Sequence, residues 1–272
     1  MKLKIFTANI AFGLKGMDNL LVNTIGHLVF HGWSMIALFL NPTSFKNRKK
    51  TLNPRRISYI KKHSSLASIL EVIKKEKPDI LMLNELIKQI QCSEIEKELS
   101  ALGYSSIYFG YSAHHDDATV SSLVASKIKG EKLAIEFTEG AHAGGGGGIV
   151  GLRLVQSNIT VVGVHMCTPK FPWLYDAQIA DIVKFLETEK LLGREVIIAG
   201  DWNASTLFLK KYPAFSKLNL INSEGDMLTC PTFLPKLEPL DHIFVPQNFK
   251  TINSKTIAFG SDHLAVSVEV GK

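Results

Sequence analysis

The chain has 272 residues, of which 46% are apolar, and its formal net charge is +6. This apolar fraction supports a sizeable core, so neither disulfides nor a structural metal is needed to stabilise the fold. The length fits one large α/β domain or two small ones. The positive charge suits an anionic partner, either nucleic acid or a membrane surface, and does not choose between them.

The cysteines Cys92, Cys167 and Cys230 are odd in number and share no metal-ligand spacing, so we expect reduced thiols in a cytoplasmic protein. Residues 1–10 alternate as a strand does, and they lack the long apolar core and cleavage site of a signal peptide. We expect the first strand of the fold here, with the polar residue Asn9 at its end.

Residues 20–40 are almost entirely apolar and contain no Lys, Arg, Asp or Glu. As a helix this segment would be about 31 Å long, enough to cross a bilayer. We reject a single crossing, because it would place Asn9 on the opposite side of the membrane from the other candidate site residues. Gly26 and Gly32 also suggest breaks in the helix.

A basic run follows the apolar segment. Its residues are Lys46, Arg48, Lys49, Lys50, Arg55, Arg56, Lys61 and Lys62. We interpret about 14–62 as an insertion without a transmembrane span. It either packs internally or lies as an apolar flap in the interface of an anionic membrane, and the second alternative predicts peripheral membrane association.

After the insertion, apolar residues from 64 onward share one face of a helix that ends at Lys77-Pro78-Asp79. Residues 80–83 then form a buried strand ending in Asn84-Glu85, and a second helix covers about 93–102. Strands are expected near residues 106–109, 121–126 and 132–137.

In the second half, residues 148–155 and 159–165 are typical of a hairpin, and a helix is expected over 173–189. The short apolar stretch 196–199 predicts a buried strand. Residues 240–245 predict a further strand, and residues 264–270 alternate as a half-buried strand does. The chain has no internal repeat, and we expect a single domain over residues 1–272.

Most of these strands carry acids, amides or imidazoles at or near an end. The clearest are two quartets, Gly200-Asp201-Trp202-Asn203 after one strand and Gly260-Ser261-Asp262-His263 before another. A rigid sheet can aim such side chains into a shared cleft. Oxygen ligands for Mg²⁺, together with groups that position water and hold phosphate, are what a metal-dependent phosphoester hydrolase needs.

Together these motifs resemble the endonuclease/exonuclease/phosphatase family, which includes deoxyribonuclease I-like nucleases and neutral sphingomyelinases. The matching pieces follow the family order, at residues 7–9, 78–85, 164–165, 198–203, 240–244 and 260–263. The resemblance implies an α/β (α+β) fold, a four-layer sandwich in which two packed, mostly antiparallel β-sheets are flanked by helices. We expect such a protein to be a monomer.

The resemblance also implies a metal site. Glu85 would be the main Mg²⁺ ligand, supported by Asn9 and Asp262. Mn²⁺ could substitute for Mg²⁺.

The same resemblance implies catalytic roles. His263 would contact the scissile phosphate, with Asp241 fixing its tautomer and charge. Asp201 would orient or deprotonate the attacking water. Asn203 and His165 would bind phosphate oxygens and stabilise the charge of the transition state.

His115, Trp202 and His242 are weaker candidates for contacts with the substrate. His115 belongs to the polar run 114–117. In the family that this chain resembles, the corresponding segment is a loop near the cleft, where His115 could contact substrate. The alternative is a solvated polar loop without such a contact. Trp202 stands where the family usually has Phe. His242 stands where an aromatic residue or Arg is common, so it either contacts phosphate or packs. Asn84 stands where the family often has Gln before the metal-binding Glu. None of these departures removes a catalytic group.

The expected activity is therefore phosphodiester hydrolysis by metal-assisted attack of water on phosphorus. The apolar segment and basic run favour a membrane phospholipid or sphingolipid as substrate. The family and the net charge keep a DNA or RNA nuclease as the alternative, and a soluble phosphate ester comes third. A catalytically silent binding module of the same fold is the non-enzyme hypothesis.

Overall fold

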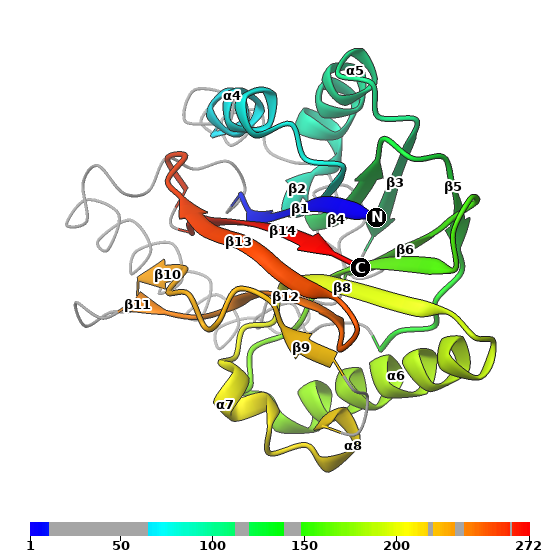
Figure 1. The fold of residues 1–272 in the computed structure, drawn as a ribbon. Helices are drawn as coiled ribbons and strands as arrows, with labels where there is room; N and C mark the ends of the chain where they lie inside the picture. Colours follow the sequence, from blue (N-terminus) through cyan, green and yellow to red (C-terminus); the bar gives the residue numbers. More distant parts are fainter. Residues whose placement is uncertain (11–64, 112–119, 139–147, 217–219, 232–236, 262) are drawn as a thin grey trace, which may run out of the picture.

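Two packed β-sheets form the centre of the molecule, with helices on both outer faces (Figure 1). The computed structural model describes residues 1–10, 65–111, 120–138, 148–216, 220–231, 237–261 and 263–272. The apolar and basic insertion expected at about 14–62 lies outside these residues. No helix among them is long and apolar enough to span a membrane.

The first six-stranded sheet has the order β13-β14-β1-β2-β4-β3. Strands β1 and β2 run parallel, and the other neighbours are antiparallel. The bounds are Lys2–Asn9 for β1, Ile80–Ile87 for β2, Ser106–Tyr111 for β3, Val120–Ser126 for β4, Lys250–Ile257 for β13 and Ala265–Gly271 for β14.

The second six-stranded sheet has the order β5-β6-β7-β8-β12-β9. Strands β7 and β8 run parallel, and the other neighbours in this sheet are antiparallel. The bounds are Gly130–Leu133 for β5, Gly148–Leu154 for β6, Ile159–His165 for β7, Glu195–Asp201 for β8, Leu220–Asn222 for β9 and Asp241–Pro246 for β12. Short strands β10 (Cys230–Pro231) and β11 (Leu237–Glu238) pair separately.

Three apolar clusters hold the layers together. One fills the space between the sheets, with Met82 of β2 and Ile197 of β8 among its members. The second packs the first sheet against the helices α4 (Leu66–Glu76) and α5 (Ser93–Ala101). A π-helical turn at Lys88–Cys92 directly precedes α5. The third packs the second sheet against α6 (Pro172–Leu191), α7 (Thr206–Leu209) and α8 (Pro213–Ser216). The predicted four-layer sandwich is confirmed.

Most of the longer elements lie where the sequence pattern predicts them. The short elements α7, α8, β9, β10 and β11 were not predicted, and two longer strands also differ. The strand expected near 132–137 lies earlier, at Gly130–Leu133. Strand β13 (Lys250–Ile257) was not predicted. Its residues are largely exposed and alternate weakly, because it is an edge strand that pairs with β14 on one side.

Candidate active site

The predicted polar residues at the strand ends meet at one edge of the two sheets. In the first sheet, Asn9 and Asn84 are register partners on the parallel pair β1 and β2. In the second sheet, Asp201 is the register partner of both His165 on β7 and Asp241 on β12. Because parallel strands end at the same edge, polar residues far apart in sequence come together.

Glu85 reaches this site because β2 is irregular there. The pairing of β2 with β4 shifts between Leu83 and Leu86, and Glu85 has a left-handed backbone with φ of 61°. In a regular strand, Asn84 and Glu85 would point to opposite faces. The bulge instead lets both side chains contact groups of the second sheet.

Asn84 joins the two sheets beneath the site. Its side-chain Nδ2 donates to Ser122 Oγ and to Val164 O, both at 3.0 Å. Its Oδ1 accepts a hydrogen bond of 3.1 Å from the backbone nitrogen of Asp201. The sequence analysis noted Asn84 only as a departure from the family pattern, and missed this role because its partners lie on three other strands.

Gly200 makes the close approach of the neighbouring strands β7 and β8 possible. Its φ is 144°, and an added Cβ would lie 1.9 Å from Val164 O. A side chain at this position would therefore push apart the strands that carry His165 and Asp201.

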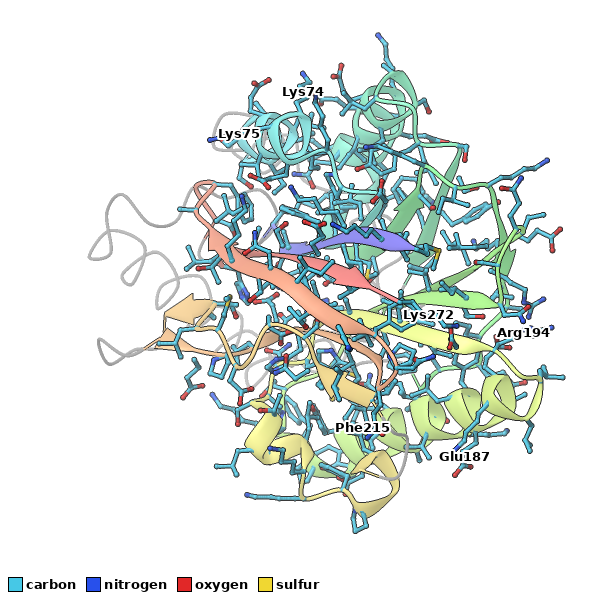
Figure 2. All side chains as sticks on the ribbon, viewed as in Figure 1. Lys74, Lys75, Glu187, Arg194, Phe215 and Lys272 are labelled. Carbon is cyan, nitrogen blue, oxygen red and sulfur yellow. The ribbon has the colours of Figure 1, made fainter. Side chains whose placement is uncertain are left out.

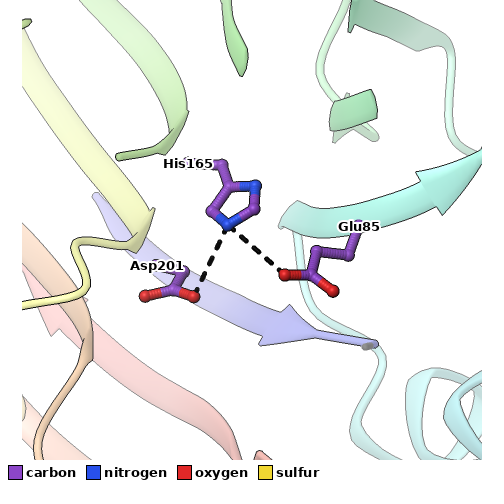
Figure 3. Close-up of side chains that lie close together, drawn as sticks. All are labelled: Glu85, His165 and Asp201. Carbon is purple, nitrogen blue, oxygen red and sulfur yellow. Dashed lines mark ion pairs between the residues drawn. The ribbon is translucent and has the colours of Figure 1, made fainter. Parts of the chain in front are cut away.

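Figure 3 shows His165 between two carboxylates. Its Nε2 lies 3.5 Å from Glu85 Oε1 and 3.7 Å from Asp201 Oδ2. The three side chains come from β2, β7 and β8, so this contact spans both sheets.

Asp201 is buried and closely surrounded. Asn9 Nδ2 donates to its Oδ2 at 2.8 Å. Burial and the nearby charge of Asp241 raise the pKa of Asp201, and they outweigh the opposing effects of His263, His165 and the bond from Asn9. The raised pKa makes this carboxylate a better proton acceptor than an exposed one.

His263 and Asp241 form the imidazole–carboxylate pair that the family resemblance implies. His263 Nδ1 lies 2.7 Å from Asp241 Oδ2, and the backbone nitrogen of Asp241 donates to Thr229 Oγ1 at 3.1 Å. Since a carboxylate accepts, Nδ1 carries the proton. Asp241 Oδ1 is buried and has no hydrogen-bond partner among the described residues.

Asn203 lies beside these groups in a left-handed conformation, with φ of 50°. Its backbone nitrogen donates to Asp201 Oδ1 at 2.7 Å, and its Nδ2 donates to Met166 O at 2.9 Å. The side chain is thus fixed next to the end of β7. One amide hydrogen of Nδ2 is used by Met166, and the second could reach a ligand.

Two of the expected substrate contacts, Trp202 and His242, are buried in this structure. Trp202 is 0% exposed and packs edge-on against Phe215 and Phe244 in the core beneath α8. His242 is also 0% exposed and is bonded to Glu224 and to the backbone of Ala204. Both residues follow a site residue directly in sequence, and neither has side-chain surface to offer a substrate.

Two further predictions, His115 as a substrate contact and Asp262 as a metal ligand, lie outside the described residues. The sequence analysis did not predict the buried hydrogen bonds of Asn84 and Glu224, because no local pattern reveals their partners.

The donor groups at this edge suit a hard divalent cation. Ligand atoms of Glu85, His165 and Asp201 lie within 4.8 Å of one another, and so do those of Asp201, Asp241 and His263. Asp241 Oδ1 is buried without a hydrogen-bond partner among the described residues, and burial together with the charge of Asp241 raises the pKa of Asp201. Mg²⁺ binds carboxylate and amide oxygens, so the residues present fit it.

Fold and site together define a class of protein: a four-layer α/β sandwich with acids, amides and imidazoles gathered at one edge of its sheets. The family description "Endonuclease/Exonuclease/phosphatase family" matches residues 57–263, and the chain belongs to this family. The resemblance noted in the motifs is thereby confirmed. Comparison with curated proteins gives no match.

Solved structures agree on the fold. An endonuclease/exonuclease/phosphatase from Beutenbergia cavernae has a TM-score of 0.64 at 16% identity, covering 99% of this chain and 71% of that chain. A humanized D. rerio TDP2 gives 0.64 at 15%, covering 100% and 99%. The human Nocturnin catalytic domain, solved with a bound sulfate anion, gives 0.59 at 16%, covering 99% and 93%. At these identities the likeness concerns the fold alone.

Proposed function

We propose that this protein is a divalent-metal-dependent phosphodiester hydrolase. The observation that carries the proposal is the convergence of Glu85, His165, Asp201, Asp241 and His263 from both sheets onto one edge. A general base, an oriented imidazole and a set of oxygen ligands are the groups that attack of water on phosphorus requires.

In this proposal Asp201 orients the attacking water and accepts its proton. Its raised pKa supports that role, because a base is most effective when its pKa lies nearer the working pH. The bond from Asn9 and the backbone bond from Asn203 hold the carboxylate in place, so that the water would be placed by a rigid group.

His263 contacts the scissile phosphate through Nε2, because Asp241 holds the proton on Nδ1. Asn203 and His165 bind the phosphate oxygens as negative charge builds up in the transition state. Asn203 is fixed by Met166 O, and His165 by the end of β7, so their positions are set before substrate arrives.

Glu85 would hold the metal with Asn9, and Asp262 would complete the set. When bound, Mg²⁺, or Mn²⁺ in its place, neutralises charge on the phosphate and assists departure of the leaving oxygen. The bulge and left-handed backbone at Glu85 support this assignment, since such strained conformations persist at functional sites.

The substrate we favour is a phospholipid or sphingolipid at a membrane surface, and a nucleic acid is the second candidate. The net charge of +6 supports either anionic surface. The name of the Beutenbergia neighbour, an endonuclease/exonuclease/phosphatase, supports the second.

The test is release of phosphorylated headgroup from liposomes, compared with nicking of plasmid DNA. Each reaction is run with Mg²⁺ and with EDTA, using the wild type and Glu85→Gln. Metal-dependent headgroup release that Glu85→Gln abolishes supports the lipid arm, and metal-dependent nicking supports the nuclease arm. If neither substrate, nor small soluble diesters, is cleaved, the binding-module hypothesis replaces the enzyme.

A further inference from the structure

A second buried carboxylate–imidazole pair, Glu224 and His242, lies behind the site. Glu224 is 3% exposed and His242 is 0% exposed. Glu224 Oε1 lies 2.7 Å from His242 Nδ1, and His242 Nε2 lies 2.9 Å from Ala204 O. Because a carbonyl oxygen only accepts, Nε2 donates to Ala204, and Glu224 sets the orientation of the ring from its other side.

Glu224 also accepts a backbone hydrogen bond from the edge of β12, close to Asp241. Strand β9 ends at Asn222, and Ser223 N still donates to Ile243 O at 3.0 Å. The backbone nitrogen of Ile243 donates to Glu224 Oε2 at 2.9 Å. A side-chain carboxylate therefore satisfies the backbone two residues after Asp241, where the neighbouring strand has already ended.

The turn that carries Glu224 is itself fixed. Asn222 Oδ1 accepts hydrogen bonds from the backbone nitrogens of Glu224 and Gly225, at 3.1 and 3.2 Å. Asp226 Oδ1 accepts from Thr206 Oγ1, at the first residue of α7. The turn is thus hydrogen-bonded to the segment that directly follows the loop of residues 200–204, which carries Asp201 and Asn203.

That loop needs external support. Asn203 has a φ of 50°, a left-handed conformation that is unfavourable for a non-glycine residue and persists where the surroundings enforce it. The neighbouring carbonyl, Ala204 O, is the group that His242 holds.

We propose that Glu224 is a positioning residue which, through His242, holds the loop 200–204 in the geometry that Asp201 and Asn203 need for hydrolysis. The inference rests on the proposed function. It assigns no contact with substrate to Glu224 or to His242.

Three substitutions of Glu224 test the proposal. Glu224→Gln can keep every bond, because its amide nitrogen can donate to His242 Nδ1 and its oxygen can accept from Ile243 N. Glu224→Ala removes both bonds. Glu224→Asp keeps the charge, but its side chain is one methylene too short to make both hydrogen bonds. This variant replaces Glu224→Ala in the test if the alanine variant does not fold. The matched control is Glu189→Ala, which removes an equally buried glutamate of helix α6 that contacts Thr160 at the opposite end of the same sheet.

The readouts are kcat, KM and amide hydrogen exchange of residues 200–206. We expect Glu224→Ala to lower kcat about 10–100-fold with little change in KM, and to speed up exchange of this segment. Glu224→Asp should show a smaller change in the same direction, and Glu224→Gln should restore wild-type values. Glu189→Ala should lower the melting temperature while kcat and the exchange of 200–206 stay unchanged.

The proposal is overturned if Glu224→Ala or a folded Glu224→Asp keeps wild-type kcat and wild-type exchange. It is also overturned if Glu224→Gln is as impaired as the alanine variant, or if Glu189→Ala gives the same changes. If the wild type hydrolyses no phosphodiester, the proposed function fails, and the exchange measurement alone still decides whether Glu224 holds the loop.

Discussion

A buried carboxylate lies near each end of the second sheet, Glu189 of helix α6 at one end and Asp201 of β8 at the other, and the two have different charged neighbours. At the start of β7, Glu189 accepts from Thr160 Oγ1 and lies 3.0 Å from Arg194 and 3.5 Å from Arg153. Arg194 lies beyond the C-terminal end of α6 (Figure 2). At the other end, Asp201 faces Asp241, and the pKa of Asp201 is raised.

The difference separates structure from function. A carboxylate surrounded by arginines already has its counter-charge, so it stabilises the fold and offers nothing to a ligand. Carboxylates that crowd one another, with no arginine or lysine partner among the described residues, leave negative charge for a bound cation to neutralise. Carboxylates near opposite ends of the same sheet therefore serve two purposes, and the partner groups decide which.

The largest effect that would test this contrast is on turnover. We expect Asp201→Asn to lower kcat by about 10²–10⁴-fold, because the proposed base is lost, with little loss of thermal stability. Glu189→Gln should leave kcat unchanged and reduce the free energy of unfolding by about 1–3 kcal/mol, because the arginines lose their partner. Steady-state kinetics and thermal melts of both variants measure this. A destabilised but active Asp201→Asn would contradict the contrast.

Gly200 gives the next largest effect, this time on stability. Gly200→Ala should cost about 4 kcal/mol or more, because its Cβ would meet Val164 O at 1.9 Å and its φ of 144° disfavours a side chain. Gly163→Ala is the matched control on the neighbouring strand. Its Cβ would meet Val150 Cγ1 at an ordinary 3.5 Å. Urea unfolding of both variants measures this difference, and equal stabilities would show that strands β7 and β8 can separate here at no cost.

The smallest effect concerns Glu76, another buried carboxylate, which lies 2.7 Å from Lys4 and 2.9 Å from Lys255. Burial alone would raise the pKa of Glu76, but the hydrogen bonds from both lysines outweigh it, and the pKa is lowered. A carboxyl whose pKa falls on folding stabilises the protein above its unfolded pKa, and that contribution is lost as pH falls.

We therefore expect Glu76→Gln to reduce the free energy of unfolding by about 1–2 kcal/mol at pH 7, with the difference shrinking as pH falls below the ordinary glutamate value of 4.5. Denaturant melts across this pH range measure it. Glu71→Gln, which removes an exposed partner of Lys74, should change nothing. A Glu76→Gln deficit that grows on acidification would contradict the assignment.

The strand ends could be predicted from sequence because apolar runs stop at polar residues, as at Asn9, His165 and Asp201. Residue type and position along the strand sufficed there. The side-chain directions could not be predicted where the strand is irregular. Glu85 faces the site because of a bulge and a left-handed residue, and no pattern in the sequence indicates either.

The packing partners of buried side chains also could not be predicted from the sequence. Trp202 and His242 stand next to catalytic candidates, yet strand alternation and the aromatic core turn them away from the site. Asn84 and Glu224 act through backbone groups of other strands, and those neighbours exist only once the two sheets have packed.

The central claim is that the crowded carboxylates at the strand ends hold a divalent cation. A thermal melt with increasing Mg²⁺ tests it most directly, because ligand that binds only the folded state stabilises it by about 2.7 kcal/mol at 100 times its Kd. We predict a Mg²⁺-dependent rise in melting temperature for the wild type and for Glu189→Gln, and none for Glu85→Gln. A wild type that does not respond to Mg²⁺ or Mn²⁺, or a Glu85→Gln variant that responds equally, would contradict the account.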